Sequence, residues 1–402
     1  MEWKEVRLGE VADVQTGPFG SQLHKENYVN KGTPIVTVEH LGNKWFTSQN
    51  LPMVSDEDKL RLAKYCSQEG DVIFSRVGSV DRCSYVSKEY SGWLFSGRCL
   101  RVRPRSGINP EYLYYFLTNE GTKQYIRNIA VGATMPSINT KLLNEVPITI
   151  PSLDDQRRIV SILSSLDRKI ELNNKINADL EEMAQAIFKN WFVDFKPFKD
   201  GKFVDSELGM IPEGWKVGTL GDITKNKSAK VKERNDVKVL SPVTTGELVL
   251  SEEYFTKQVF SSSIAKYKIV NKGDFAYNPA RVNIGSLGRN EFDFDGCVSP
   301  VYVVFSVLDG YENYFDLFRN TDFFKDSVAS LAIGGVRQSL SYDDLCSIEV
   351  IIPSENAVEE FNNLYNQMKK TIKANKLENS RLSLLRDTLL PRLMSGELEV
   401  PE

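Results

Sequence analysis

Arginines in short glycine-containing loops are the residues of this sequence best suited to recognise a nucleobase. Arg76 follows a predicted strand and precedes Gly78, and Arg281 lies in the corresponding loop before Gly285. A guanidinium can donate two parallel hydrogen bonds to guanine O6 and N7, or it can bind a phosphate. Ser75, directly before Arg76, adds a hydroxyl to the first loop. A surface salt bridge accounts for either arginine equally well.

Side-chain amides form a second set of candidates, because they match adenine N6 and N7. Asn278 follows a predicted strand, and Arg337 and Gln338 follow two glycines in what we expect to be a flexible loop. Each has a structural alternative. Asparagine before proline is typical of a turn, and residues 134–137, which correspond to the Arg337 loop, are much less polar.

Further basic residues of the first half suit phosphate binding. Lys44 lies beside Trp45 in the stretch where the two halves of the chain differ most, and divergent loops are natural carriers of specificity. Arg101, Arg103 and Arg105 alternate along a predicted strand, which places their guanidiniums on one face. Phosphate contacts there would carry no sequence information, and a solvated strand face explains the run slightly better.

Catalytic motifs are absent from the sequence. It contains no GxGxxG or GxxxxGK(S/T) phosphate loop, no HExxH metal motif and no GxSxG nucleophile elbow. The nearest approach to an amino-methyltransferase NPP(F/Y) loop is Asn278-Pro279-Ala280, which lacks the second proline and the aromatic residue. We therefore expect no catalytic residues in this chain.

The composition is that of a globular protein, with 41% apolar and 26% charged residues among 402. Five cysteines without a CxxC pair and only two histidines argue against a metal site and indicate reduced thiols. No apolar run reaches the length of a membrane span and no signal peptide is recognisable, so we expect a cytoplasmic protein. The net charge of −4 means that DNA binding needs segregated basic residues or a basic partner.

The chain contains an internal repeat of about half its length. Residues 132–152 (GATMPSINTKLLNEVPITIPS) match residues 334–354 (GGVRQSLSYDDLCSIEVIIPS) at an offset of 202 without a gap. Gly70-Asp71-Val72 matches Gly273-Asp274-Phe275 at an offset of 203, and the openings around Trp3 and Trp215 match at 212. The first copy therefore carries roughly nine extra residues between Val14 and Gln68.

Apolar residues then recur in both halves at three- and four-residue steps, which predicts two long helices packed along one coiled-coil seam. The first seam comprises Ile159, Ile162, Leu166, Ile170, Ile176, Leu180, Met183 and Ile187. The second comprises Phe361, Leu364, Met368, Ile372, Leu382, Leu385 and Leu389, with Glu378 as the polar exception. The alternative is that each helix packs only on its own domain.

Polar residues mark the register and the ends of these helices. Asn173 and Asn375 occupy equivalent seam positions, where a buried amide pair would set the register. Ser152 with Asp155 has the pattern of a capping box, and Ser354 can cap the second helix. Pro391 is expected to end it. At 1.5 Å per residue the first helix would extend on the order of 50 Å, enough to separate two globular domains.

The expected fold class is α+β, with two duplicated globular halves of short strands and helices joined by helical spacers. The predicted boundaries are 1–152 for the first domain, 153–195 for the central helix, 196–214 for a linker, 215–353 for the second domain and 354–402 for the C-terminal helix and tail.

Several segments resemble the specificity subunits of type I restriction–modification systems. The central junction (188–195 and 207–215) and the C-terminal tail (390–398) are similar to those of the family. Gly17-Pro18-Phe19-Gly20-Ser21 and residues 70–76 (GDVIFSR) resemble its target-recognition domains. The resemblance covers essentially the whole chain. Residues 273–286 (GDFAYNPARVNIGS) depart from the first copy, so contacts do not transfer between the copies.

The resemblance implies a pseudo-twofold chain in which two α/β target-recognition domains each read one half of an asymmetric, bipartite DNA sequence. Two antiparallel helices would dock two modification subunits, which carry S-adenosylmethionine and methylate adenine N6, and two translocase–nuclease subunits would complete a restriction enzyme. Trp191, Phe192, Phe195 and Leu393 are the residues expected to bind these partners. The rivals are a protein scaffold that does not touch DNA, and a subunit of a methylation-only complex.

Overall fold

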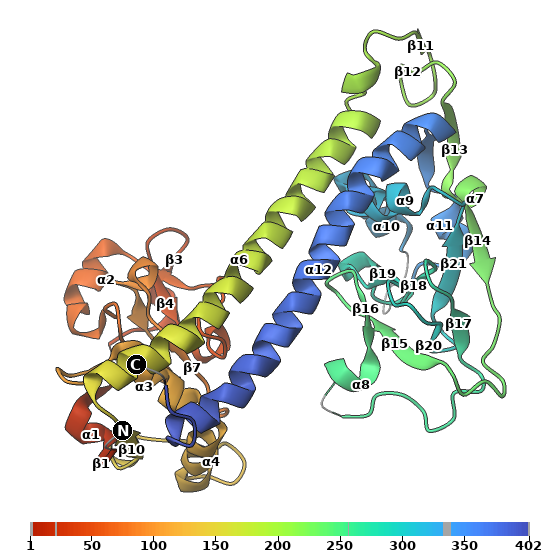
Figure 1. Ribbon diagram of the computed structural model, residues 1–402. Coiled ribbons are helices and arrows are strands. Elements are labelled where there is room, and N and C mark those ends of the chain that lie inside the picture. The colour runs from red at the N-terminus through yellow and green to blue at the C-terminus, as the bar shows by residue number, and fades with distance from the viewer. Residues whose placement is uncertain (1–2, 21, 256, 333–338, 401–402) are drawn as a thin grey trace. The chain divides into compact units, whose positions relative to one another are not determined.

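The chain divides into two compact units (Figure 1). The computed structural model describes residues 3–20, 22–255, 257–332 and 339–400. The first unit comprises residues 1–174 and 376–402, and the second comprises residues 175–375. Each unit contains one globular domain and one half of each of two 40-residue helices, α6 (Leu153–Phe192) and α12 (Glu355–Met394). The fold is α+β, as predicted.

The first domain is built on two small sheets. The main sheet is antiparallel, with the order β2 (Ala12–Thr16), β9 (Cys99–Pro104), β6 (Val72–Ser75), β7 (Cys83–Tyr85). The other has the order β3 (Tyr28–Val29), β5 (Met53–Val54), β4 (Thr33–Val36), β8 (Leu94–Phe95). β1 (Lys4–Arg7) pairs with β10 (Pro147–Ile150). The helices are α1 (Leu8–Val11), α2 (Asp56–Arg61), α3 (Pro110–Thr118), α4 (Glu120–Ile129) and α5 (Thr140–Asn144).

The second domain repeats this plan. Its main sheet has the order β14 (Thr224–Lys227), β21 (Val303–Val307), β18 (Phe275–Tyr277), β19 (Leu287–Arg289). Its other sheet has the order β16 (Leu248–Leu250), β15 (Lys238–Pro242), β20 (Gly296–Val298), β17 (Lys268–Val270). β13 (Lys216–Thr219) pairs with β22 (Glu349–Ile352), and β11 (Phe203–Val204) with β12 (Ile211–Pro212). The helices are α7 (Leu220–Ile223), α8 (Ser251–Tyr254), α9 (Glu312–Phe318), α10 (Asp322–Leu331) and α11 (Tyr342–Cys346).

Strand register confirms the internal repeat. Val72 of β6 faces Val102 of β9, and Phe275 of β18 faces Phe305 of β21, so both partners shift by the same 203 residues. The apolar side chains of these paired strands are buried, because helices such as α3 and α9 contribute Tyr, Phe and Leu side chains to the same cores. The repeated sequence thus builds the same main sheet twice, whereas the other sheets differ, since β3 pairs with β5 in the first domain and β17 pairs with β20 in the second.

The two long helices lie antiparallel within each unit, as predicted. In the first unit Asn173 of α6 donates to Glu378 and Asn379 of α12, and in the second Asn375 of α12 donates to Asn177 of α6. Asn173 and Asn375 therefore do not pair with each other. Asn173 instead pairs with Asn379, and Asn375 pairs with Asn177, so both units have an equivalent Asn–Asn hydrogen bond. Glu378, the exception in the predicted seam, accepts a hydrogen bond there.

The predicted seam is correct in part. Ile159 and Phe361 are buried, but Met183, Leu364 and Leu385 are about half-exposed. Leu163 and Phe188 are fully buried instead, because each helix packs on its own domain as well as on the other helix. Both arrangements weighed from the sequence therefore occur together.

The helix starts agree with the sequence, whereas one helix end does not. Ser152 accepts from the Asp155 amide and donates to its carboxylate, and the Ser354 hydroxyl accepts from the Ala357 amide. Pro391 does not end α12, which continues to Met394. The proline forfeits one backbone hydrogen bond, but the extra turn buries Leu393 and Met394 in the core of the first unit.

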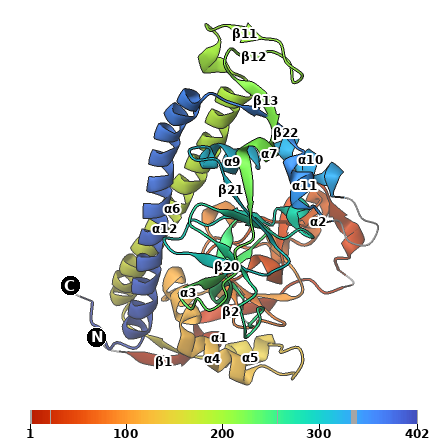
Figure 2. The same ribbon diagram turned by 90° about the vertical axis from the view of Figure 1, so that its right-hand side faces the viewer.

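Residues close to the two ends of the chain lie together in the first unit (Figure 2). The indole of Trp3 packs against Gly396, where an added Cβ would lie 2.5 Å from Trp3 Nε1. Gly396 also has a φ of +75°, which favours glycine. The C-terminal motif at residues 390–398 therefore packs against the N-terminal part of the first unit.

Candidate nucleic-acid interface

Four loops of the first unit meet at one edge of its main sheet. Because the sheet is antiparallel, the ends of β2 and β6 lie at the same edge as the starts of β9 and β7. The Arg76 amide donates to the Arg98 carbonyl, Gly17 to Cys99, and Gly78 to Pro136. We refer to loops 17–20, 76–82, 96–98 and 131–137 as the first loop edge.

Close backbone packing explains the glycines of this edge. A Cβ on Gly17 would lie 2.1 Å from the Ser96 carbonyl oxygen, and a Cβ on Gly97 would lie 2.4 Å from that of Pro18. Only glycine fits at either position, so loops 17–20 and 96–98 are held against each other. The Gly-Pro-Phe-Gly motif thus presents Phe19 at the surface, where its side chain is 53% exposed.

Arg76 lies on the first loop edge and keeps part of its guanidinium free. Nη1 donates to the Gly97 carbonyl at 3.2 Å, and the guanidinium carbon lies 4.8 Å from the centre of the Phe19 ring. Arg82 and Arg98 are exposed beside it, and within the described ranges neither guanidinium has a hydrogen-bond or ion-pair partner. Val131 and Met135 add exposed apolar side chains, 64% and 67% accessible.

Ser75 is not available at this edge. Its side chain is buried, and its hydroxyl donates to the Val77 carbonyl at 2.8 Å. The geometry therefore favours a structural role for Ser75, the residue that ends β6.

Arg101 and Arg103 share one strand face, as their alternation predicts, but this face is not solvated. Arg103 donates from Nε and Nη2 to the two oxygens of Asp71, both at 2.7 Å, and Arg101 donates to the carbonyls of Lys64 and Cys66. The hydrogen bonds to Asp71 raise the pKa of Arg103, whereas burial lowers the pKa of Arg101. This geometry favours a structural role for both guanidiniums over contact with DNA phosphates.

The Gly-Asp pairs of the two copies are turn motifs. Gly70 and Gly273 have φ values of +91° and +87°, which favour glycine. Asp71 then accepts from the Gln68 amide and from Arg103, and Asp274 accepts from the Asn271 amide and from Lys227. Burial raises the pKa of Asp274 although Lys227 opposes the shift.

Lys44 lies inside the first unit, away from the first loop edge. Its ammonium donates to Glu111 at 2.9 Å and to the Tyr115 hydroxyl at 3.1 Å, and it lies 3.5 Å from Asp167 of α6. Arg386 of α12 donates to the same Asp167 at 2.9 Å. Lys44 therefore ties the extra segment of the first copy to the helices, and the geometry favours this role over DNA contact.

The second unit presents the equivalent sheet edge. The Leu340 amide donates to the Pro279 carbonyl, as the Ile138 amide donates to Arg76 in the first unit, so Pro279 takes the place of Arg76. We refer to loops 278–286 and 299–302 as the second loop edge. Arg337 and Gln338 lie outside the described residues. The Asn278 side-chain oxygen accepts from the Ala280 amide, which is the turn anticipated as its alternative role.

Arg281 is the most accessible candidate of the second loop edge. Its side chain is exposed, and its guanidinium has no hydrogen-bond or ion-pair partner among the residues that the structure describes. Ile284 and Val301 lie on the same edge and are 55% and 72% exposed. Both edges therefore combine free arginine with exposed apolar side chains, although the residues differ.

The residues expected to bind partner subunits belong largely to the two cores. Phe192 and Leu393 are 3% and 1% exposed. Phe192 packs against Trp215, Tyr314 and Phe361, with ring centres 5.0–5.9 Å apart. Trp191 and Phe195 are half-buried around the same aromatic cluster. Leu393 thus belongs to the core of the first unit, whereas Phe192 and Phe195 also line the groove described next.

A groove of about 750 Å³ lies beside this cluster in the second unit. Its floor is aromatic, and Val193 and Phe323 on its walls are about half-exposed. The lining includes Phe188, Phe192, Phe195, Leu208, Tyr314, Phe318 and Ile351, with Lys189, Asp322 and Glu349 among its polar residues. Sequence reasoning missed this groove, because α6, α9, α10 and β22 form it together.

The described residues offer no other obvious chemistry. Among them, no group of three or more His, Cys, Asp or Glu side chains is placed to hold a metal ion. A search of the same residues finds no helix that is long and apolar enough to cross a membrane.

Comparisons with known proteins give a consistent result. Residues 1–182 match the family model of the type I restriction modification DNA specificity domain. The specificity subunit of the type I restriction enzyme MjaIX from Methanocaldococcus jannaschii is 30% identical over 415 residues, covering 100% of this chain and 94% of its relative. The HindI specificity subunit from Haemophilus influenzae is 23% identical, and the alignment covers 99% of this chain and 100% of its relative.

The fold also has a solved counterpart. The S subunit of a type I restriction–modification system from M. genitalium aligns with a TM-score of 0.57 at 15% identity, covering 100% of this chain and 96% of that chain.

Proposed function

Because the chain belongs to the family of type I restriction enzyme specificity subunits, we propose that it reads an asymmetric, bipartite DNA sequence, one half with each loop edge. The observation that carries this proposal is the duplicated sheet edge, which bears free arginines in both units. A duplicated scaffold suits two half-sites, and the different side chains of the two edges suit two different half-site sequences. The chain itself supplies recognition without chemistry.

Partner subunits would supply what this chain lacks. Modification subunits would carry S-adenosylmethionine and methylate adenine N6, and translocase–nuclease subunits would add restriction. The net charge of −4 means that the isolated chain has little long-range attraction for DNA, so we expect it to bind DNA weakly without the modification subunits.

The apolar groove beside α6 is the surface we assign to a modification subunit. It is built on α6, one of the two long helices, and it is an apolar depression lined in part by the predicted partner residues Phe192 and Phe195. A partner side chain filling the groove would remove Val193 and Phe323 from water, which favours association.

The proposed function is tested with the reconstituted complex and the Arg281→Ala variant. Methylome sequencing of cells that express the chain with its modification subunit first identifies the target. If Arg281 forks onto a guanine, Arg281→Ala should weaken binding by roughly 1–3 kcal/mol and relax one base of one half-site. If it contacts a phosphate, affinity should fall for all sequences and the salt dependence should flatten.

Two further variants make this experiment decisive. Arg281→Lys keeps the charge, so it should restore a phosphate contact but not a bidentate base contact. Lys216→Ala, at an exposed position on β13 away from the edge, should leave DNA affinity unchanged. A complex that assembles but binds DNA without sequence preference would contradict the proposed function and would favour the scaffold alternative.

Docking at the groove is tested by placing charge in it. Val193→Asp should reduce complex assembly at least about tenfold, because an unpaired carboxylate would have to leave water at the interface. The control is Leu308→Asp, since Leu308 and Val193 are both 51% exposed but Leu308 lies at the end of β21, outside the groove. Assembly is measured by analytical ultracentrifugation, and equal assembly of both variants would rule out the groove.

A further inference from the structure

We propose that Phe19 is a DNA-contacting wedge, which inserts its ring against a base step in the half-site of the first unit while Arg76 holds it in place. This inference rests on the proposed function and adds to it a residue and a mode of contact. The candidates predicted from the sequence are polar or charged, so none of them would contact a base through an apolar side chain. The exposed apolar side chains of both loop edges indicate such a contact.

The backbone around Phe19 is built to present the ring outward. Gly17 and Gly97 allow loops 17–20 and 96–98 to touch at distances that no Cβ would permit, and the Phe19 carbonyl accepts from the Gln22 amide at 2.7 Å. These contacts hold the backbone at Phe19, and its ring remains 53% exposed. Leaving so large an apolar side chain in water costs free energy, so a site that presents it rigidly favours a role in contact with a partner.

Arg76 makes Phe19 suitable for DNA in particular. Its guanidinium carbon lies 4.8 Å from the ring centre, and its Nη1 donates to the Gly97 carbonyl, so positive charge and an exposed aromatic side chain lie together on this loop edge. Proteins that kink DNA commonly combine arginine with apolar wedges such as Phe, Met or Ile. Arg82 and Arg98 are exposed residues of the same loop edge, and Asp81 is paired with Arg127, so it does not cancel their charge.

The second unit repeats the combination with different residues. Ile284 and Val301 are exposed at the equivalent sheet edge beside Arg281. The two edges share almost no residue identities, yet both join free arginine to exposed apolar side chains. Double-stranded DNA as the common partner of both edges explains this shared chemistry. A protein partner explains it less well, because burying the unpaired arginines in a protein interface would cost desolvation free energy.

The test uses the complex with its modification subunits and duplexes of the target found by methylome sequencing. 2-Aminopurine, whose fluorescence rises when it unstacks, replaces single adenines of each half-site in turn, excluding the adenine that is methylated. The wild-type complex should raise the fluorescence at one step of the first half-site. Phe19→Ala should abolish this signal and weaken binding by about 5- to 100-fold, while leaving the second half-site unchanged.

Three variants distinguish the wedge from other roles. Phe19→Leu keeps an apolar side chain and should retain part of the signal, whereas Phe19→Asn should lose it. Leu60→Ala removes an exposed apolar side chain of α2, which is not part of the first loop edge, and should change nothing. The melting temperature of each variant verifies folding, which an exposed position should preserve.

The outcomes separate the two proposals. Wild-type complex that binds its target specifically without unstacking any base, or Phe19→Ala that retains both signal and affinity, would overturn the wedge and leave the proposed function standing. Wild-type complex without sequence-specific binding would overturn the proposed function itself.

Discussion

Asp71→Ala is expected to lower the free energy of unfolding of the first unit by about 3–5 kcal/mol. The Asp71 carboxylate is 1% exposed and accepts two hydrogen bonds from Arg103 and one from the Gln68 amide. Without it, the guanidiniums of Arg101 and Arg103 remain in a largely buried site without a counter-charge. Urea denaturation followed by circular dichroism measures the loss.

The control for Asp71 lies in the same sheet. Asp13 pairs with Arg105, but both side chains are about half-exposed, so Asp13→Ala should cost less than about 1 kcal/mol. Equal losses for the two variants would show that the Asp71 pair does not contribute as a buried ion pair. That result would favour the prediction from the sequence that Arg101 and Arg103 bind phosphates.

Asp167→Ala is expected to cost about 3 kcal/mol and to loosen the first domain from the helices of its unit. Asp167 is 8% exposed and accepts from the Tyr115 hydroxyl at 2.5 Å and from Arg386 at 2.9 Å, with Lys44 at 3.5 Å. Burial, and then the charge of Asp167, raise the pKa of Tyr115, which keeps this hydroxyl a proton donor. Thermal unfolding and hydrogen exchange at α3 would report the change.

A double-mutant cycle apportions this network. Lys44→Ala, Asp167→Ala and the double variant give the coupling energy of the pair, which should exceed about 0.5 kcal/mol if Lys44 acts through Asp167. Asp179→Ala, at an exposed position of α6, should change stability by no more than about 0.5 kcal/mol. If Lys44→Ala weakened DNA binding without affecting stability, Lys44 would be a DNA ligand after all.

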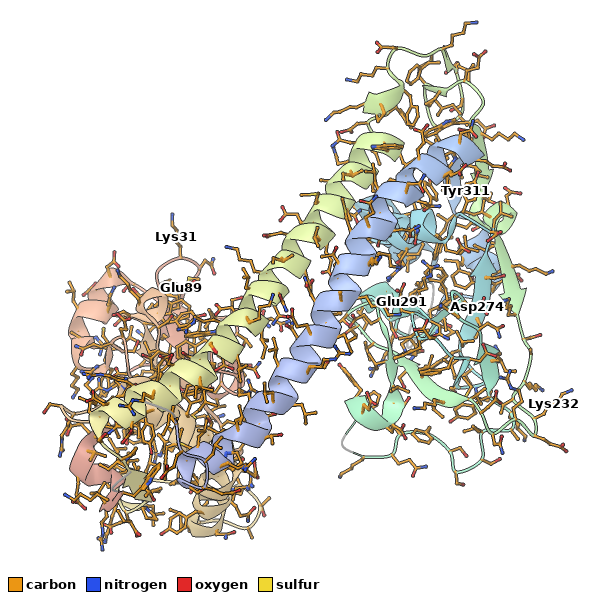
Figure 3. The ribbon with its side chains drawn as sticks, in the orientation of Figure 1. Lys31, Glu89, Lys232, Asp274, Glu291 and Tyr311 are labelled. Carbon is orange, nitrogen blue, oxygen red and sulfur yellow. The ribbon has the colours of Figure 1, made fainter. Side chains whose placement is uncertain are left out.

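The second unit joins its domain to its helices through an ion pair in which the charges are reversed. The residue 202 positions after Asp167 is Lys369 of α12, which lies 3.7 Å from Asp316 of α9 and donates to Glu291 at 2.5 Å. Figure 3 shows Glu291 and the domain to which it belongs. The helix residue of the pair is therefore acidic in the first unit and basic in the second. Replacing the helix residue of one unit by that of the other would place two like charges together.

The duplication of the globular domain and the two long helices followed from the sequence by itself. The offsets of 202 and 203 predicted that one domain is built twice, because equal spacing of apolar residues imposes equal strands and helices. The three- and four-residue steps predicted both long helices, and Ser152 marked the start of the first. The helix signals are local, since each depends on residues within a few positions of one another, whereas the repeat is found by comparing the two halves of the sequence.

Only the tertiary structure decided which charged residues remain free for a partner. Arg103 and Asp71 are 32 residues apart, and Arg386 and Asp167 are 219 apart, so no local pattern revealed that these side chains neutralise each other. The same holds for Pro391, since the burial of Leu393 and Met394 outweighs the usual effect of proline on a helix. Arg76 keeps part of its guanidinium free, Arg281 has no partner among the described residues, and the Phe19 ring is exposed. Only the long-range packing of the other candidates revealed this.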